Sequence, residues 1–277
     1  MKIGVGLPNT TPAGAPLTTE WSRRAETGPF STVAVLDRLV YDSVDPLIAL
    51  TAAAAVTERV GLATMVAIGP LRNSALLAKQ AASIDAIAAG RLTLGLAVGA
   101  RLDDYEIAGV EHGDRGRRLA EQLAFLRTGW GNAGIGPAPA RPGGPRLLVG
   151  GASGRAFARM ARYADGYAHG GGPPRAFAGA AARARAAWSA CGRPGEPELW
   201  GQAYFALGDE DVGAAYLRHY YAFAGPFAEK VASANLTSER AIRNLIGAYE
   251  DEGCDQLILL PTVSDPEQLD RLAAIVA

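Results

Sequence analysis

The feature that most constrains the fold is a pattern that repeats eight times in 277 residues. Each repeat is a short apolar run bounded by Gly, Pro or Asp, followed by a longer Ala-, Leu- and Arg-rich segment with helical spacing. Runs that are apolar on both faces, such as Leu92–Val98, fit parallel strands covered by helices. Eight β-α units of this length predict an α/β protein, a (β/α)8 TIM barrel over residues 1–277 as a single domain. A doubly wound open sheet is the alternative.

The predicted elements alternate along the whole chain. The strands are expected at Lys2–Leu7, Thr32–Leu36, Val60–Ile68, Leu92–Val98, Arg146–Val149, Gly166–His169, Leu199–Leu207 and Gln256–Leu260. The helices are expected at Leu17–Thr27, Pro46–Glu58, Ala75–Ala88, Asp114–Thr128, Gly154–Tyr163, Pro174–Ala190, a long stretch from Asp209 to Glu252, and Pro266–Val276.

Charge and composition exclude several classes of partner. The 27 basic and 28 acidic side chains leave a formal net charge of −1, so the chain has no excess of positive charge that would attract nucleic acid or an anionic membrane. Two cysteines and three histidines are too few and too scattered for a disulfide framework or a metal site, so we expect free thiols and no metal. No apolar stretch reaches the ~20 residues of a membrane span, and the chain opens directly on a strand pattern. We therefore expect a cytoplasmic protein.

Two segments do not follow the alternation. Gly129–Pro145 is too rich in Gly and Pro for regular structure, and it is either a plain surface loop or a loop with a role in substrate access. Tyr216–Phe227 packs five aromatic residues into twelve positions. Such density is typical of a core, but the segment precedes the last strand, so it is alternatively a lid over a flat ligand.

Ionisable groups at the strand ends are the first candidates for chemistry, because barrel active sites are built from the carboxyl ends of strands. Asp37 ends an apolar strand and is either a pocket carboxylate or half of an ion pair with the adjacent Arg38. His169 ends another strand, where it could exchange a proton near neutral pH or make a structural hydrogen bond. Both are candidate catalytic residues.

Two glycine clusters follow neighbouring strands. The first cluster leads into a helix and consists of Gly150, Gly151, Ala152 and Ser153. Free N–H groups and the helix dipole at such a position favour a phosphate, and an ordinary tight turn is the alternative interpretation. Gly170–Gly172 follows the next strand. The chain has no Ser-His-Asp set, zinc helix or Walker loop. A phosphate cradle with few ionisable groups favours a bound organic cofactor that carries the reaction.

Four ordered motifs carry a family resemblance. They are an Arg-Asn turn with the following helix and strand in Pro70–Ala100, the segment Gly109–Arg127, the turn Leu147–Gly154 with Ala161–Tyr167 after it, and the last strand Gly253–Pro261. Together they span most of the chain, which resembles the luciferase-like monooxygenase superfamily of flavin- or deazaflavin-dependent barrel oxidoreductases. The resemblance implies a flavin-like ring across the barrel mouth, a phosphate near the late loops, and a homodimer.

The resemblance also implies roles for particular residues. Asp37 corresponds to the aspartate after strand two, and a non-prolyl cis peptide is expected within Met65–Ile68. The implied cofactor contacts are Asp37, Val66, Ala67, Ile68, Asp103, Gly150, Gly151, Ala152, Ser153, Gly170 and Gly171. The chain departs from the family pattern at Arg38, where many deazaflavin users have a histidine, and at Ala100 or Arg101, where some relatives carry an acid.

Two cofactors are compatible with this resemblance. Coenzyme F420 transfers hydride only, whereas FMN in the same barrel activates molecular oxygen. Lysine occurs at positions 2, 79 and 230 only, among 27 basic residues, which is typical of GC-rich genomes whose bacteria often make the deazaflavin. We therefore predict hydride transfer between reduced F420 and a small, apolar organic substrate, with Asp37 or His169 relaying the proton. An FMN-dependent monooxygenase and a non-redox barrel that binds a phosphorylated ligand are the alternatives.

Overall fold

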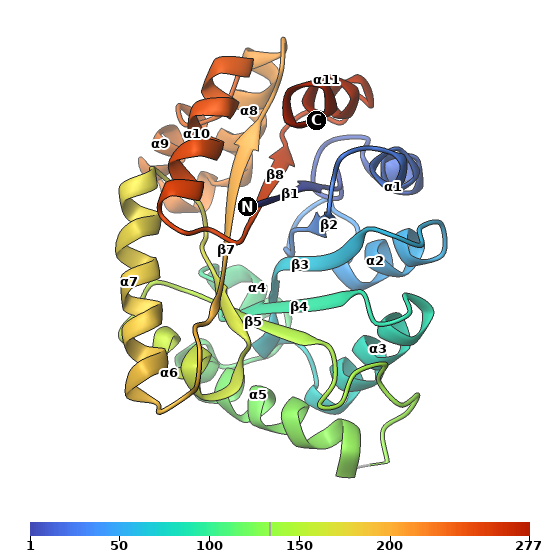
Figure 1. The fold of residues 1–277 in the computed structure, drawn as a ribbon, viewed down its shortest axis with the longest axis vertical. Helices are drawn as coiled ribbons and strands as arrows, with labels where there is room; N and C mark the ends of the chain where they lie inside the picture. The colour runs from blue at the N-terminus through green and yellow to red at the C-terminus, as the bar shows by residue number, and fades with distance from the viewer. Residues whose placement is uncertain (133) are drawn as a thin grey trace.

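Eight parallel strands close into a barrel in the computed structural model, which describes residues 1–132 and 134–277 (Figure 1). The strands follow the order of the sequence around the barrel, and β1 pairs with β8, which excludes the open sheet. Every predicted strand is present, with ends within two residues of the prediction. The strands are β1 (Lys2–Gly6), β2 (Thr32–Val35), β3 (Gly61–Ile68), β4 (Leu92–Ala97), β5 (Arg146–Gly150), β6 (Gly166–Ala168), β7 (Glu198–Phe205) and β8 (Gln256–Pro261).

Helices surround the barrel and connect its strands. Several begin at side-chain caps: Asp45, Asn73, Ser153 and Ser238 each accept a hydrogen bond from the first turn that follows. The helices are α1 (Thr18–Thr27), α2 (Pro46–Ala54), α3 (Ser74–Ile87), α4 (Leu102–Ile107), α5 (Arg115–Asn132), α6 (Gly154–Tyr163), α7 (Pro174–Ala190), α8 (Glu210–Tyr220), α9 (Phe227–Ala232), α10 (Glu239–Asp251) and α11 (Glu267–Val276).

The helices differ from the prediction in several places, and α2 ends at Ala54 rather than at Glu58. The stretch from Asp209 to Glu252 is divided into α8, α9 and α10. Gly225, with a φ of 56°, and Pro226, which has no N–H to continue a helix, separate α8 from α9, and Leu236 forms a β-bridge with Phe205 between α9 and α10. The short helix α4 was not expected. Helix α5 runs to Asn132, so the first part of the Gly129–Pro145 segment is helical; residue 133 lies outside the described residues.

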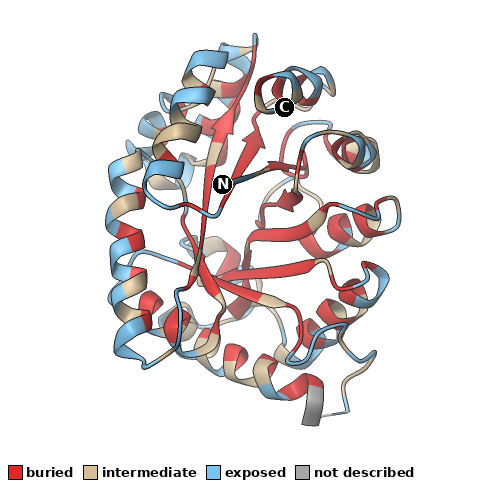
Figure 2. Cartoon of the chain, viewed as in Figure 1, coloured by how far each residue is buried: buried red, intermediate tan, exposed pale blue. Residues whose placement is uncertain are grey.

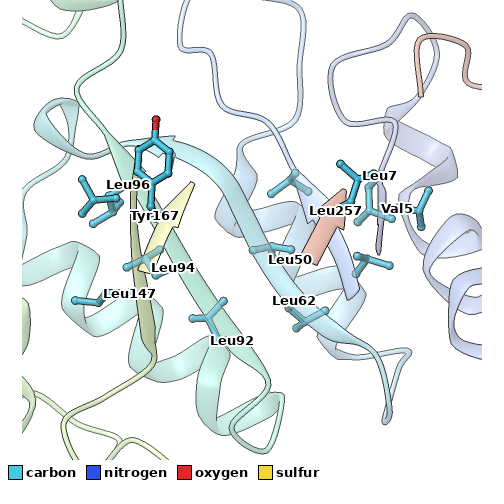
Figure 3. Close-up of a cluster of buried hydrophobic side chains, with 14 of the residues drawn as sticks. Val5, Leu7, Leu50, Leu62, Leu92, Leu94, Leu96, Leu147, Tyr167 and Leu257 are labelled. Atoms are coloured by element: carbon cyan, nitrogen blue, oxygen red, sulfur yellow. The ribbon is translucent and has the colours of Figure 1, made fainter. Parts of the chain in front are cut away.

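The apolar core has two layers. Inside the barrel, side chains such as Met65, Leu148 and Ile258 pack against one another. A larger layer lies between the barrel and the helices, where Leu62 and Leu94 are among the side chains drawn in Figure 3. Figure 2 shows strands that are buried along most of their length and helices that are buried mainly on the side facing the barrel. These layers hold the strand ends that form the candidate site.

Strand β3 is irregular near its carboxyl end. Its register against β4 shifts between Thr64 and Ala67, and the Met65–Val66 peptide bond is cis, within the segment where the resemblance implied one. A Cβ atom added at Gly95 of β4 would lie 2.3 Å from the Thr64 carbonyl oxygen and 3.0 Å from Val66 Cγ1. Glycine at this position therefore allows the irregular part of β3 to lie against β4.

Two further observations concern the chain as a whole. Both cysteines are free, as predicted: Cys191 is exposed and Cys254 is buried. Across residues 1–132 and 134–277, no helix has both the length and the apolar character that crossing a membrane requires.

Candidate functional site

A small cavity lies at the carboxyl end of the barrel. It has a volume of about 160 Å³ and is enclosed by the ends of β2, β3 and β4 and by the segment that follows α8. We call it the mouth cavity. Three of the predicted site residues, Asp37, Val66 and Ile68, line it. The other lining residues are Leu36, Arg38, Ala97, Gly99, Ala100, Arg101, Asp104, Tyr220, Tyr221 and Phe223.

Asp37 is held by a buried network. Its side chain is 4% exposed, and Oδ2 accepts the Ile68 N–H at 2.8 Å. Arg72 Nη2 lies 3.1 Å from both carboxylate oxygens, while Arg72 Nη1 donates to Asp45 at 2.9 Å. Burial raises the pKa of the Asp37 carboxyl, and the charge of Arg72 opposes that rise. An ion pair with Arg38 was therefore the wrong expectation, because Arg72 is the partner.

Arg38 instead fills part of the mouth cavity. Its guanidinium carbon lies 4.5 Å from the ring centroids of both Tyr41 and Tyr220, and Nη1 donates to the Tyr220 carbonyl. Within the described part of the chain, its buried Nε has no hydrogen-bond partner. Phe223 covers this group, with its ring centroid 5.5 Å from Arg38 and 5.0 Å from the guanidinium carbon of Arg101. Cation–π contacts thus close the mouth.

Different residues of the aromatic segment Tyr216–Phe227 match the two predicted roles, core and lid. Tyr216 and Tyr220 are buried, and the Tyr216 hydroxyl lies 2.7 Å from the Thr10 hydroxyl, so these rings belong to the core. Phe223 is 43% exposed above the mouth cavity, in the position expected of a lid residue. The Tyr221 hydroxyl makes a 2.9 Å hydrogen bond with the Tyr204 hydroxyl of β7.

A second, mostly apolar cavity lies beside the mouth. It has a volume of about 390 Å³, and Tyr221 lines both cavities. Gly170 and Gly171 line this second cavity rather than the mouth. A Cβ at Gly171, where φ is 91°, would approach the Gln202 carbonyl oxygen to 3.0 Å. The remaining lining residues are Gly172, Pro173, Gln202, Ala203, Tyr204, Phe227, Lys230, Val231, Ala234, Leu236 and Leu245.

The glycine turn after β5 forms a cradle at the start of α6. Gly151 has a φ of 117°, and its carbonyl accepts a 3.0 Å hydrogen bond from the Tyr167 hydroxyl. The Ser153 hydroxyl caps α6 by accepting the Ala156 N–H at 3.2 Å. The first N–H groups of a helix have no acceptor within it, so they are available to an anion at this turn. The cradle consists of Gly150, Gly151, Ala152 and Ser153.

A third cavity, which we call the arginine groove, begins at this cradle. It has a volume of about 940 Å³ and lies between the start of α5 and the start of α6. Four arginines line it, so its charge favours an anionic ligand. The lining residues are Val98, Gly113, Arg115, Gly116, Arg117, Ser153, Gly154, Arg155, Ala158 and Arg159.

The structure does not bring His169 to Asp37. The two residues follow β6 and β2, which are four strands apart in an eight-stranded barrel and so lie on opposite sides. The His169 ring packs edge-on against Phe177 of α7, with centroids 5.6 Å apart. Among the described residues, neither ring nitrogen has a hydrogen-bond partner. Burial lowers the pKa of His169, which favours the neutral ring at pH 7.

Two other predicted contacts lie outside the cavities. Asp103 on α4 forms an ion pair with Arg101, which itself lines the mouth cavity. Ala67 is fully buried in the layer between the barrel and the helices.

The sequence interpretation missed several residues of the site. Arg72 belongs to the Arg-Asn turn of the family motif, and it follows β3, the neighbour of β2; that adjacency is the signal that could have paired it with Asp37. Arg155 and Arg159 are four residues apart on α6, a spacing that places both on one face of the helix. Phe223 carried no signal beyond the aromatic density of its segment.

The closed barrel, with cavities at the carboxyl ends of its strands, places the protein in the class of (β/α)8 barrels. Comparison with known proteins defines the family: the model of luciferase-like monooxygenases matches residues 1–276, and the chain belongs to this family.

Similar proteins are found by sequence and by structure. The chain is 39% identical over 140 residues to the uncharacterized protein Rv0940c of Mycobacterium tuberculosis, covering 45% of this chain and 48% of that protein. It is 32% identical over 196 residues to pyrimidine monooxygenase RutA of Escherichia coli, covering 62% and 52% of the two chains. The matches thus span about half the length of these curated relatives.

Solved structures with low sequence identity share the fold. An F420-dependent secondary alcohol dehydrogenase in complex with an F420-acetone adduct superposes with a TM-score of 0.81 at 16% identity, over 100% of this chain and 99% of that one. Monooxygenase RslO1 from Streptomyces bottropensis gives a TM-score of 0.77 at 21% identity, over 99% and 97% of the two chains.

Proposed function

We propose that the protein transfers hydride between coenzyme F420 and a small, apolar organic substrate. The observation that carries this proposal is the cradle Gly150–Ser153, which opens into an arginine-lined groove beside the barrel mouth. This arrangement suits a cofactor with an anionic end and a ring at the mouth. The similarity of the fold to an F420-dependent alcohol dehydrogenase supports the same cofactor.

The residues at the mouth fit such a ring only after a side-chain movement. The mouth cavity of about 160 Å³ is smaller than the roughly 300–1,000 Å³ of typical ligand pockets. Phe223 is exposed and closes the cavity through its contacts with Arg38 and Arg101, so its displacement would enlarge the cavity. The bound deazaflavin would supply the hydride-transfer chemistry, and the protein would orient the ring against the substrate.

We propose different tasks for the two candidate catalytic residues. Asp37 faces the mouth, but its oxygens already accept hydrogen bonds from Ile68 and Arg72. We therefore propose that Asp37 holds the end of β3 and the turn after it in place beside the cofactor. His169 directly precedes Gly170 and Gly171, which line the apolar cavity. The neutral His169 ring packs against Phe177 of α7, so it would have to turn toward that cavity to accept a proton from a substrate there.

The test is a side-by-side titration of the purified protein with oxidised F420 and with FMN. A ligand at 100 times its Kd stabilises a protein by about 2.7 kcal/mol. For a protein of this size we expect Tm to rise by roughly 5–10 °C, with a matching absorbance change for F420. Stabilisation by FMN alone would overturn the deazaflavin assignment.

An FMN-dependent monooxygenase is the second candidate. The similarity to pyrimidine monooxygenase RutA favours it. Oxygen consumption that requires both reduced FMN and substrate would identify this activity. If neither cofactor stabilises the protein but inorganic phosphate does, the barrel instead binds a phosphorylated ligand without redox chemistry.

We also propose a homodimer. Ile48 of α2 and Leu76 and Ile87 of α3 are large apolar side chains that are more than half exposed, and burying them against a second copy would be favourable. Light scattering during size-exclusion chromatography measures the mass directly, and a monomer at micromolar concentration would contradict this proposal.

A further inference from the structure

The arginine groove carries positive charge that the protein itself does not neutralise. Arg117 pairs with Asp114 at 2.7 Å and with Glu121 at 2.9 Å. The other three arginines of the groove, Arg115, Arg155 and Arg159, form no ion pair with any residue in the ranges that the structure describes. Three like charges on one concave surface raise the local concentration of anions.

Arg159 lies in this groove against the neighbouring helix. A Cβ added at Gly116 would lie 3.4 Å from Arg159 Nη1, so the guanidinium lies against the first turn of α5. Its Nε is buried and finds no hydrogen-bond partner among the described residues. Burial and the charge of Arg155 lower the pKa of Arg159, and an anion in the groove would relieve both effects.

The groove extends away from the cradle. Ser153 and Gly154 form its edge at the cradle, and the arginines continue along α6 to Arg159, four residues and about 6 Å beyond Arg155. A single phosphate bound at the helix start needs only the cradle. The additional arginines indicate that the ligand continues as an anion past its phosphate.

We propose that Arg115, Arg155 and Arg159 bind a chain of carboxylates attached to the phosphate end of the cofactor. This inference rests on the proposed function. Coenzyme F420 continues past its phosphate into a tail of linked glutamates, whereas FMN ends at the phosphate. Guanidinium groups pair well with carboxylates through two parallel hydrogen bonds. The groove is therefore a specificity site that distinguishes the two cofactors by their anionic ends.

A basic cavity at the opposite end of the barrel provides a contrast. Arg59 and Arg91 line that cavity, but their guanidinium groups already donate to backbone carbonyls of the surrounding loops, among them those of Phe30 and Val60. Such arginines tie the loops together and have few donors left for a ligand. Arg115 Nη1 donates to the His112 carbonyl at 2.7 Å, whereas the guanidinium groups of Arg155 and Arg159 make no hydrogen bond within the described residues.

The test compares three forms of the deazaflavin. One is F420 with its glutamate tail, one ends at the phospholactate, and one is the riboside without phosphate. Kd is measured for each with the full chain and with the double variant Arg155→Gln, Arg159→Gln. The control is Arg162→Gln, which removes one positive charge from the same helix at a residue that does not line the groove, and it is compared with each single variant as well as with the double variant. FMN is titrated in parallel.

We expect the tailed form to bind about tenfold more tightly than the form that ends at the phospholactate, since each exposed ion pair contributes about two- to fivefold. The double variant should lose most of this advantage and bind the shorter form as the unmodified protein does, which shows that it is folded. The control should retain the advantage. The advantage should also shrink as the salt concentration rises.

The results separate the inference from the function on which it rests. Equal binding of the tailed and tail-less forms, or a tail advantage that survives in the double variant, would overturn the inference while leaving F420 as the cofactor. Failure of all three deazaflavins to bind, with or without binding of FMN, would overturn the proposed function and the inference with it.

Discussion

Replacing Asp37 by Asn tests whether this carboxylate holds the mouth together. Asn has the same shape but no charge, so the variant loses the ionic interaction with Arg72 and weakens the bond from the Ile68 N–H. Removing one partner of a buried ion pair costs about 3–5 kcal/mol. Arg72 is 19% exposed and keeps Asp45 as a partner, so we expect a loss near the low end, about 3 kcal/mol.

The measurement is the free energy of unfolding by urea denaturation, together with Tm. A loss of about 3 kcal/mol corresponds to a fall in Tm of roughly 6–12 °C for a protein of this size. Asp45→Asn is the matched control, because Asn still caps α2 while the exposed half of the ion pair is lost. We expect the control to cost less than about 1 kcal/mol.

A double variant distinguishes two explanations of the loss. Burial raises the pKa of Asp37 and the charge of Arg72 opposes that rise, so the cost of burying the carboxylate offsets part of what the ion pair contributes. We expect the loss in Asp37→Asn to come mainly from the charge left on Arg72, which keeps only the more exposed Asp45 as a partner. Adding Arg72→Gln should then recover stability or cost little more. If Asp37→Asn lowers Tm by less than 2 °C, or if the two losses simply add, the reasoning is refuted.

Four further predictions concern other parts of the molecule. Burial raises the pKa of the Cys254 thiol to about 12, so a thiol reagent at pH 8 should label only Cys191 in the folded protein and both cysteines after unfolding. Burial likewise raises the pKa of Tyr167 to about 12, above the value of about 10 in unfolded chains. The free energy of unfolding should therefore be highest below pH 10 and fall toward pH 12, and it should fall less steeply in Tyr167→Phe. Urea midpoints at pH 8, 10 and 11 would show this difference. Gly151→Ala should lower stability by about 1–3 kcal/mol, because its φ of 117° disfavours a side chain, and an unchanged Tm would contradict this. Phe223→Ala should change stability by less than about 1 kcal/mol but raise the association rate of the cofactor in stopped-flow mixing, and an unchanged rate would mean that Phe223 does not obstruct the mouth.

The sequence predicts the barrel well because burial on both faces leaves a clear mark on each strand. It does not predict partners across the barrel equally well. Arg38 is the neighbour of Asp37 in the chain, but both residues follow the end of β2, where strand alternation no longer sets the direction of side chains. Arg38 stacks on the rings of Tyr41 and Tyr220, and Arg72 pairs with Asp37. The ion pair follows from the adjacency of β2 and β3, which becomes informative only once the barrel order is known.

Side-chain direction at a strand end depends on a single step of register, which explains the remaining differences at the site. Ala168 packs inside the barrel, so the next residue, His169, turns toward α7. Strand β3 shifts register between Thr64 and Ala67, which brings Val66 to the mouth while Ala67 lies in the outer layer. Motifs can therefore locate the loops that bind a ligand. The side chains that contact the ligand depend on local irregularities and on residues distant in the sequence, such as Arg159 of α6, which lies beside Gly116 of α5.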